Sequence, residues 1–133
     1  MRILFVGHAY HLRTRSCDFF VSALESVGSI LRLYVTPESL EDAVVLESLD
    51  FSSFDVVVLW QVDFLAAFFL SRGCPTIVAP MFDASATLPV AHWRGMVGAL
   101  LVCFSRDLHF LARAHGLNSI YVRYFPALIL KAW

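Results

Sequence analysis

The sequence predicts an α/β fold, namely a doubly wound, mainly parallel sheet of about six strands with helices on both faces. Short apolar runs alternate along the chain with segments of helical spacing, and this alternation is typical of repeated βαβ units. Most runs contain no polar break, as expected for strands that helices cover on both sides. With 133 residues and no internal repeat, the chain has the length of one domain.

The strands are predicted from apolar runs that end at turn residues. In chain order, the runs cover 3–6, 29–35, 56–60, 76–79, 99–104 and 120–124. The first run, Ile3 to Val6, is followed by Gly7, where we expect the strand to turn into a polar loop over 8–16. The β-branched residues of the third run make it the clearest strand in the chain.

The helices are predicted from capping residues and apolar spacing. In chain order, they cover 16–28, 40–49, 62–72, 90–97 (a short helix or turn) and 105–115. Ser16, Ser39 and Ser105 precede the first, second and last segments as N-caps, and Ser39 also opens a capping-box-like motif. Gly73 and Gly116 follow the third and last segments as stop signals. Three apolar residues lie on one face of 16–28: Phe20, Leu24 and Val27.

The composition is more apolar than that of an ordinary small domain. Apolar residues make up 59% of the chain and charged residues 16%, against typical values of about 45–50% and about 25%. This excess predicts an extra face that is buried against a partner or a further domain. The formal net charge of −1 and the scattered arginines argue against a nucleic-acid partner.

The sequence also indicates the compartment. The longest apolar stretch, 56–70, is broken by Gln61 and Asp63 and is too short for a membrane span. The opening run is too short for a signal peptide, so we expect a cytoplasmic protein. Cys17, Cys74 and Cys103 are widely spaced and form no C-x-x-C pair, which predicts buried free thiols and no metal site.

A binding site is expected at the carboxyl ends of the strands. With the common strand order 3-2-1-4-5-6, the order reverses between the first and fourth strands, and ligands bind at that point. Two loops would then line the crevice, 8–16 and 81–89. The Gly7-His8 turn lacks the further glycines of a dinucleotide fingerprint, and no phosphate-binding P-loop motif is present. Asp55 precedes the third strand instead of ending it, which excludes a phosphorylatable receiver domain.

The first loop carries four candidate side chains. His8 and His11 form an H-x-x-H pair without a third ligand at diagnostic spacing, so a metal site is not indicated. They either make hydrogen bonds within the loop or, above the crevice, contact substrate and transfer protons. Arg13 and Arg15 are either solvated charges or ligands for a phosphate or carboxylate group.

The other candidates follow later strands. Asp83 either caps a turn or helix or acts as a general base toward an acceptor hydroxyl, and Ser85 lies in the same loop. Gln61 and Asp63 follow the third strand, and Asp63 is expected to stabilise the start of a helix. We expect structural roles for the three remaining histidines: His92, His109 and His115.

The order of these segments resembles the N-terminal half of a GT-B glycosyltransferase, the type with two Rossmann-like domains. Met1 to His8 is similar to the opening strand and turn of that family, and Phe54-Asp-Val-Val to its third-strand motif. The segment Pro75 to Asp83 and the closing pattern from Ala99 through Pro126 also resemble the family. The likeness spans essentially the whole chain.

The resemblance implies an acceptor-side domain over 1–126, with 127–133 as a tail or the start of an interdomain linker. Such a domain binds a glycan or lipid-linked acceptor, and a second domain holds most of the site for the nucleotide-sugar donor. A lipid-linked acceptor would place the protein at the inner face of a membrane. The chain stops where the family's linker would start, so we expect a half-enzyme that is inactive alone, with no cofactor.

The resemblance also assigns roles to the candidate residues. Asp83 or His8 would be the catalytic base, and Gly7 with His8 would face the donor phosphates or the transferred sugar. The remaining candidates would bind substrate: His11, Arg13, Arg15, Gln61 and Ser85. An alternative is a non-enzymatic Rossmann-like binding or regulatory module that dimerises through an apolar face. A small nucleotide-dependent enzyme of another doubly wound class is the third possibility, which the missing glycines weaken.

Overall fold

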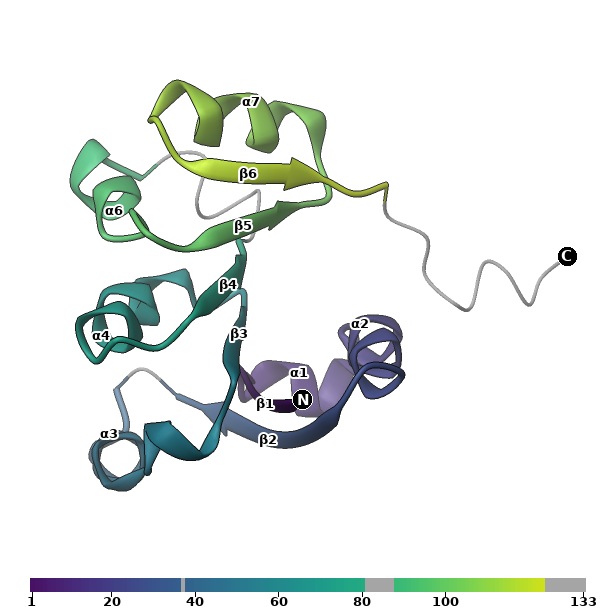
Figure 1. The fold of residues 1–133 in the computed structure, drawn as a ribbon, viewed down its shortest axis with the longest axis vertical. Helices are drawn as coiled ribbons and strands as arrows, with labels where there is room; N and C mark the ends of the chain where they lie inside the picture. Colours follow the sequence, from purple (N-terminus) through teal and green to yellow (C-terminus); the bar gives the residue numbers. More distant parts are fainter. Residues whose placement is uncertain (37, 81–87, 124–133) are drawn as a thin grey trace, which may run out of the picture.

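A computed structural model describes residues 1–36, 38–80 and 88–123. These residues form an α/β fold with one six-stranded sheet in which every neighbouring pair of strands is parallel. Helices pack on both faces of the sheet (Figure 1). The predicted fold class is therefore confirmed.

The elements alternate along the chain as the apolar pattern predicts. The strands are β1 (Arg2–His8), β2 (Ser29–Val35), β3 (Val56–Trp60), β4 (Thr76–Ala79), β5 (Leu100–Cys103) and β6 (Asn118–Tyr121). The helices are α1 (Tyr10–Thr14), α2 (Asp18–Glu25), α3 (Leu40–Ser48), α4 (Ala66–Ser71), α6 (Val90–Arg94) and α7 (Arg106–Ala114). Two short 3-10 helices complete the described residues, η1 (Phe51–Ser53) and η2 (Asp63–Leu65).

The strand order differs from the predicted 3-2-1-4-5-6. It is β2-β1-β3-β4-β5-β6, so β1 lies between β2 and β3 and β2 is an edge strand. Val6, for example, is in register with Leu33 of β2 and Leu59 of β3. The prediction was wrong because apolar runs locate strands but do not encode which strands pair. The order consequently reverses between β1 and β3, not between the first and fourth strands.

This order explains the distribution of helices. The chain moves from β1 to β2 in one direction and then returns past β1 to β3, and it continues that way to β6. Because parallel crossovers are right-handed, the two directions place helices on opposite faces. Figure 1 shows α1 and α2 on one side of the sheet and α3, α4 and α6 on the other. Leu108 and Ala112 of α7 share the buried cluster of that second group.

Each face of the sheet has its own apolar core. The larger core lies under α3, α4, α6 and α7 and includes the fully buried side chains of Phe69 and Trp93. The smaller core lies under α2, where Val21 and Cys17 pack with Phe5 and Val58. At its carboxyl end, this core contains an aromatic group around Trp60: Phe19, Phe20 and Phe104.

The N-terminal segment differs most from its prediction. β1 does not end at Gly7 but continues through His8, because Gly7 pairs with Tyr34 on one side and Trp60 on the other. The predicted loop 8–16 contains the helix α1. The next helix is shorter than 16–28, and its buried residue is Val21, while Val27 is exposed.

Several predictions from local sequence are confirmed. The Ser39 hydroxyl accepts a hydrogen bond from the backbone N–H of Asp42, and Ser105 caps α7 in the same way. Gly73 and Gly116 have positive φ angles of 74° and 77°, as expected of helix stop signals. The three cysteines are free and buried, and burial raises the pKa of each thiol. None of the helices within the described ranges has the length and apolar character that a membrane crossing requires.

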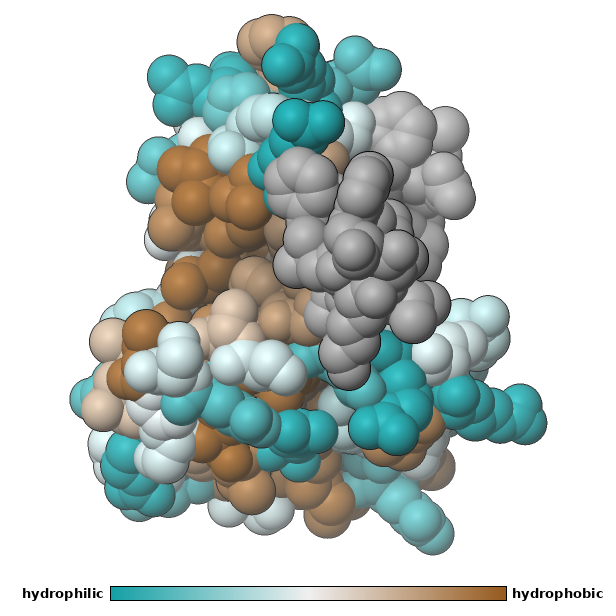
Figure 2. Space-filling model, turned by 90° about the vertical axis from the view of Figure 1, so that its right-hand side faces the viewer, coloured by the Kyte–Doolittle hydropathy of each residue, from teal (hydrophilic) through white to brown (hydrophobic). Residues whose placement is uncertain are grey.

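On the sheet face that carries α2, the part next to β6 has no helix over it among the described residues. Ser119 of β6 faces the larger core, so its neighbours Ile120 and Val122 lie toward the opposite face. Their side chains are 44% and 39% exposed. Figure 2, which views the molecule from the right-hand side of Figure 1, shows an apolar area below a polar top, with apolar and polar residues mixed in the lower part. The apolar excess of the composition is thus partly visible as exposed surface.

Candidate functional site

A polar cluster lies at the carboxyl ends of β1 and β3, where the strand order reverses. His8 ends β1, and His11 and Ser16 follow it in the loop that contains α1. Gln61 follows β3 directly, and its backbone N–H donates a hydrogen bond to Ala79 O at 2.8 Å. Doubly wound sheets bind their ligands at this point of the fold, so the cluster is the candidate functional site.

His8 presents a hydrogen-bond donor to this site. Its ring Nδ1 accepts a hydrogen bond from the backbone N–H of Tyr10 at 3.0 Å. In the neutral ring, the proton then resides on Nε2. His8 therefore offers an N–H group to a ligand, and its lone pair is occupied by the backbone.

His11 is buried and held by its neighbours. The side chain is 5% exposed, although α1 is a surface helix. Its ring packs edge-on against Trp60 and Tyr10, with centroids 6.5 Å and 5.7 Å away. Its Nδ1 lies 2.6 Å from the Ser16 hydroxyl oxygen. Burial lowers the pKa of His11 below its ordinary value, the nearby His8 lowers it further, and the Gln61 side chain opposes the shift.

Gln61 combines backbone strain with a buried polar atom. Its φ of 57° lies in the left-handed region, which residues other than glycine rarely adopt. Among the described residues, its buried amide oxygen has no hydrogen-bond partner of normal geometry, and the same is true of the Trp60 indole N–H. Strained residues cost about 1–3 kcal/mol each and cluster at functional sites.

We expect acid to destabilise the protein through His11. Its pKa in the folded chain lies below the ordinary 6.5, so the unfolded chain binds this proton more readily. Stability is therefore complete above the unfolded pKa and falls as the pH drops below it. Thermal unfolding followed by circular dichroism between about pH 7.5 and about pH 5.5 measures this loss. The His11→Gln variant should lose less stability over the same interval, and an unchanged pH dependence would contradict the assignment.

The structure separates the predicted residues into three groups. His8, His11 and Gln61 come together, and Gly7 precedes His8 in β1, where an added Cβ would approach the Tyr34 ring to 3.3 Å. Arg13 and Arg15 are exposed. Arg15 pairs with Asp18 at 2.8 Å, which agrees with a solvated charge. Asp83 and Ser85 lie outside the described residues.

Sequence reasoning missed Ser16 as a member of the site. Its hydroxyl was expected to cap the helix that follows, but the residue at the N-cap of α2 is Cys17, without a side-chain cap. Arg15 ends α1 with a φ of 55°, and this turn brings Ser16 back to His11. No spacing rule encodes such a turn, so the sequence held no signal for this contact.

The remaining histidines join secondary-structure elements, as predicted. His92 Nε2 of α6 lies 2.6 Å from Asp63 Oδ2, and Asp63 stands in the first turn of η2 at the end of β3. His109 of α7 lies 2.8 Å from the Ser119 hydroxyl of β6. His115 stacks on Trp93, with ring centroids 5.1 Å apart. Within the described ranges, no group of three or more possible ligands is placed to hold a metal ion.

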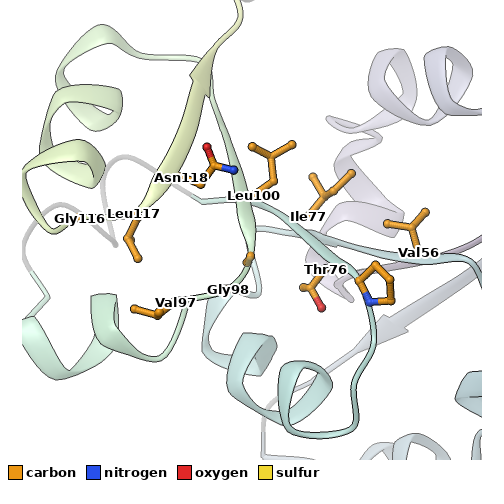
Figure 3. A pocket seen from close by; sticks show the side chains of 11 residues that line it. Val56, Thr76, Ile77, Val97, Gly98, Leu100, Gly116, Leu117 and Asn118 are labelled. Atoms are coloured by element: carbon orange, nitrogen blue, oxygen red, sulfur yellow. The ribbon is translucent and has the colours of Figure 1, made fainter.

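A groove of about 510 Å³ lies at the opposite ends of the strands. Val56, Ile77 and Leu100 line it from β3, β4 and β5, and Asn118 lines it at the start of β6 (Figure 3). The groove therefore lies at the amino ends of the strands, away from the polar cluster.

Comparison of the chain with family models, curated proteins and solved structures found no match.

Proposed function

We propose that this chain is the acceptor-side domain of a GT-B glycosyltransferase, which binds a glycan or lipid-linked acceptor. The observation that carries the proposal is the polar cluster of His8, His11 and Gln61 at the carboxyl ends of β1 and β3. The hydrogen-bond donors and acceptors of these three side chains suit the recognition of sugar hydroxyl groups. The segments that resemble the family coincide with β1, β3 and β4, which supports the same proposal.

The geometry refines the proposed roles. The N–H of His8 would donate a hydrogen bond to a sugar hydroxyl or a donor phosphate, because its Nδ1 is already occupied. The base that accepts the proton of the acceptor hydroxyl would then be Asp83. Gln61 would accept or donate a hydrogen bond beside His8. The nucleotide-sugar donor would bind mostly through a second domain, so the chain alone should show acceptor binding without turnover.

Acceptor binding by the isolated chain tests the proposal. Amide chemical shifts would be followed while a mixture of short oligosaccharides, or a polyprenyl-linked disaccharide in detergent micelles, is added. We expect shifts concentrated at His8, His11 and Gln61, and a loss of binding in His8→Ala. A nucleotide sugar should bind much more weakly than the acceptor.

A matched control is available on the other side of the molecule. His109→Ala removes a histidine of α7 that contacts Ser119 of β6, and α7 packs on the larger core, on the opposite face of the sheet from α1 and α2. It should leave acceptor binding unchanged. Absence of binding to every saccharide, or shifts confined to the groove of Val56 and Leu100, would refute the acceptor-side role.

The exposed apolar face favours a second candidate function, a binding module that dimerises. β6 is an edge strand without charged residues between Asn118 and Tyr121, and Ile120 and Val122 are exposed beside it. Unprotected edges of this kind pair with other strands. Two copies could join their β6 edges about a two-fold axis, since such an interface is self-complementary.

Molar mass in solution tests this second candidate. Light scattering after size exclusion should report a dimer for the unmodified chain and a monomer for Ile120→Asp, because the carboxylate would be buried in the interface. Val27→Asp, at an exposed apolar residue next to α2, is the matched control and should remain dimeric. A concentration-independent monomer would exclude this candidate.

A further inference from the structure

We propose that Ser16 is the nucleophile of an acyl-transfer site, in which His11 is the general base and Gln61 orients the base. The substrate class is a carboxylic ester. The inference does not depend on the glycosyltransferase proposal, because it concerns covalent chemistry at a hydroxyl group that the other proposal does not use.

The proposed nucleophile and base are in direct contact. The Ser16 hydroxyl is exposed, while His11 beside it is buried, and their O and N atoms are 2.6 Å apart. The Thr14 hydroxyl donates to the Ser16 oxygen at 3.3 Å. The proton of Ser16 is therefore free to point at His11 Nδ1. This is the arrangement that activates a serine in covalent catalysis.

A further requirement is the protonation state of the base. A ring that accepts the Ser16 proton at Nδ1 carries its own proton on Nε2. Burial disfavours the charged form of His11, so its lone pair is available near neutral pH. His8 from β1 is an ionisable neighbour that lowers the pKa of His11 further, Tyr10 of α1 packs on the ring at 5.7 Å, and the Gln61 side chain favours protonation. Gln61 can thus stabilise the His11 imidazolium that forms during the reaction.

The last requirement is a site for negative charge. Ser16 stands immediately before α2, a helix of eight residues. Among the described residues, the backbone N–H of the next residue, Cys17, makes no hydrogen bond to another backbone group, and it lies beside its own thiol. In serine hydrolases of the α/β class, the N–H of the residue after the nucleophile stabilises the oxyanion. The Cys17 N–H could serve the tetrahedral intermediate in the same way.

A second serine–histidine pair in the same chain shows why Ser16 is singled out. His109 Nδ1 lies 2.8 Å from the Ser119 hydroxyl, nearly the distance found at Ser16. Ser119, however, is only 6% exposed and packs against Cys103 in the larger core. No ester can reach it. The two serine–histidine pairs therefore have similar contacts, but only the Ser16 hydroxyl is accessible to an ester from solvent.

The proposed reaction balances with water as the second reactant. Ser16 Oγ attacks the ester carbonyl carbon, an O–C bond forms, and the hydroxyl proton passes to His11 Nδ1. The tetrahedral intermediate collapses, the bond to the leaving oxygen breaks, and the alcohol departs with the proton from His11. Water, deprotonated by His11, then attacks the acyl-serine, which releases the carboxylic acid and returns the proton to Ser16.

Acylation by p-nitrophenyl acetate tests the proposal on the full chain. The protein is mixed with the ester and quenched in acid, and its peptides are mapped by mass spectrometry. We expect one acetyl group on Ser16, with release of p-nitrophenolate on the same time scale. His11→Gln should slow acylation by about 100-fold, the usual contribution of a general base. Ser16→Ala should abolish the labelled peptide.

Two controls separate this chemistry from general reactivity. Ser119→Ala removes the buried serine of the matched pair and should acylate at the unmodified rate. Ser22→Ala, at an exposed serine of α2, should do the same. Acetyl groups on His11 or on lysine instead of Ser16, or an unchanged rate in Ser16→Ala, would overturn the proposal. Circular dichroism checks that each variant is folded, because Ser16→Ala also removes the hydroxyl beside the buried His11 ring.

Discussion

Replacing Phe69 by alanine is expected to lower the free energy of unfolding by about 3–5 kcal/mol, the range found for large aromatic truncations in protein cores. The Phe69 side chain is fully buried in the larger core. Its ring contacts Phe51 and Phe68 edge-on, with centroids 5.4 Å and 5.0 Å away. Truncation would remove this apolar contact and leave a cavity between α4 and the sheet. A loss of that size approaches the whole stability of a small domain.

Chemical denaturation followed by fluorescence or circular dichroism measures this effect. Phe110→Ala is the matched control, because the Phe110 side chain is 66% exposed on α7. Surface substitutions of that kind change stability by only about 0.5 kcal/mol. If Phe69→Ala lost no more than Phe110→Ala, the described packing of α4 would be incorrect.

Local features of the fold could be predicted because they depend on neighbouring residues. The strands 29–35, 56–60 and 76–79 were predicted with the bounds that the structure gives them. Ser39 and Ser105 were recognised as caps because a hydroxyl before a helical segment can satisfy only nearby N–H groups. These inferences need no knowledge of the tertiary structure.

The strand order could not be predicted in the same way. Both 3-2-1-4-5-6 and the observed β2-β1-β3-β4-β5-β6 satisfy the rule of right-handed crossovers. They differ in which strand borders β1, and the side chains of β3 and β4 are equally apolar. The error moved the expected crevice by one strand. The predicted order placed the residues that follow β4 beside His8. In the observed order, β3 borders β1, so Gln61 is the neighbour of His8.

The candidate site was only partly visible in the sequence for a related reason. His8, His11 and Gln61 could be named because polar residues directly follow apolar strands. The role of Ser16 depends on the left-handed conformation of Arg15, an ordinary residue that gives no sign of this turn. Asp63 and His92 are 29 positions apart, and their contact requires α6 to pack against the end of β3. Contacts of this kind are set by tertiary packing.

Replacing His92 by alanine is the second substitution for which we expect a large effect, a loss of about 3 kcal/mol in the free energy of unfolding. Asp63 is 8% exposed, and its Oδ2 accepts a hydrogen bond from His92 Nε2 at 2.6 Å. Removal of the His92 ring leaves the buried Asp63 carboxylate with one hydrogen bond fewer. A buried carboxylate that lacks hydrogen bonds destabilises the folded state, whether the lost ring was neutral or charged. His109→Ala is the comparison, because it removes a hydrogen bond to a neutral hydroxyl worth about 1 kcal/mol.

The double variant Asp63→Asn/His92→Ala separates the pair from its surroundings. A neutral amide is less costly to bury than a carboxylate, so Asp63→Asn should recover part of the loss caused by His92→Ala. Additive effects of the two substitutions would show that the pair is not coupled.

Asp63 stands two residues after Gln61, and the pair joins α6 to the segment that carries Gln61. A coupled pair therefore also predicts that His92→Ala weakens ligand binding or acylation at the polar cluster, although His92 itself is no part of it.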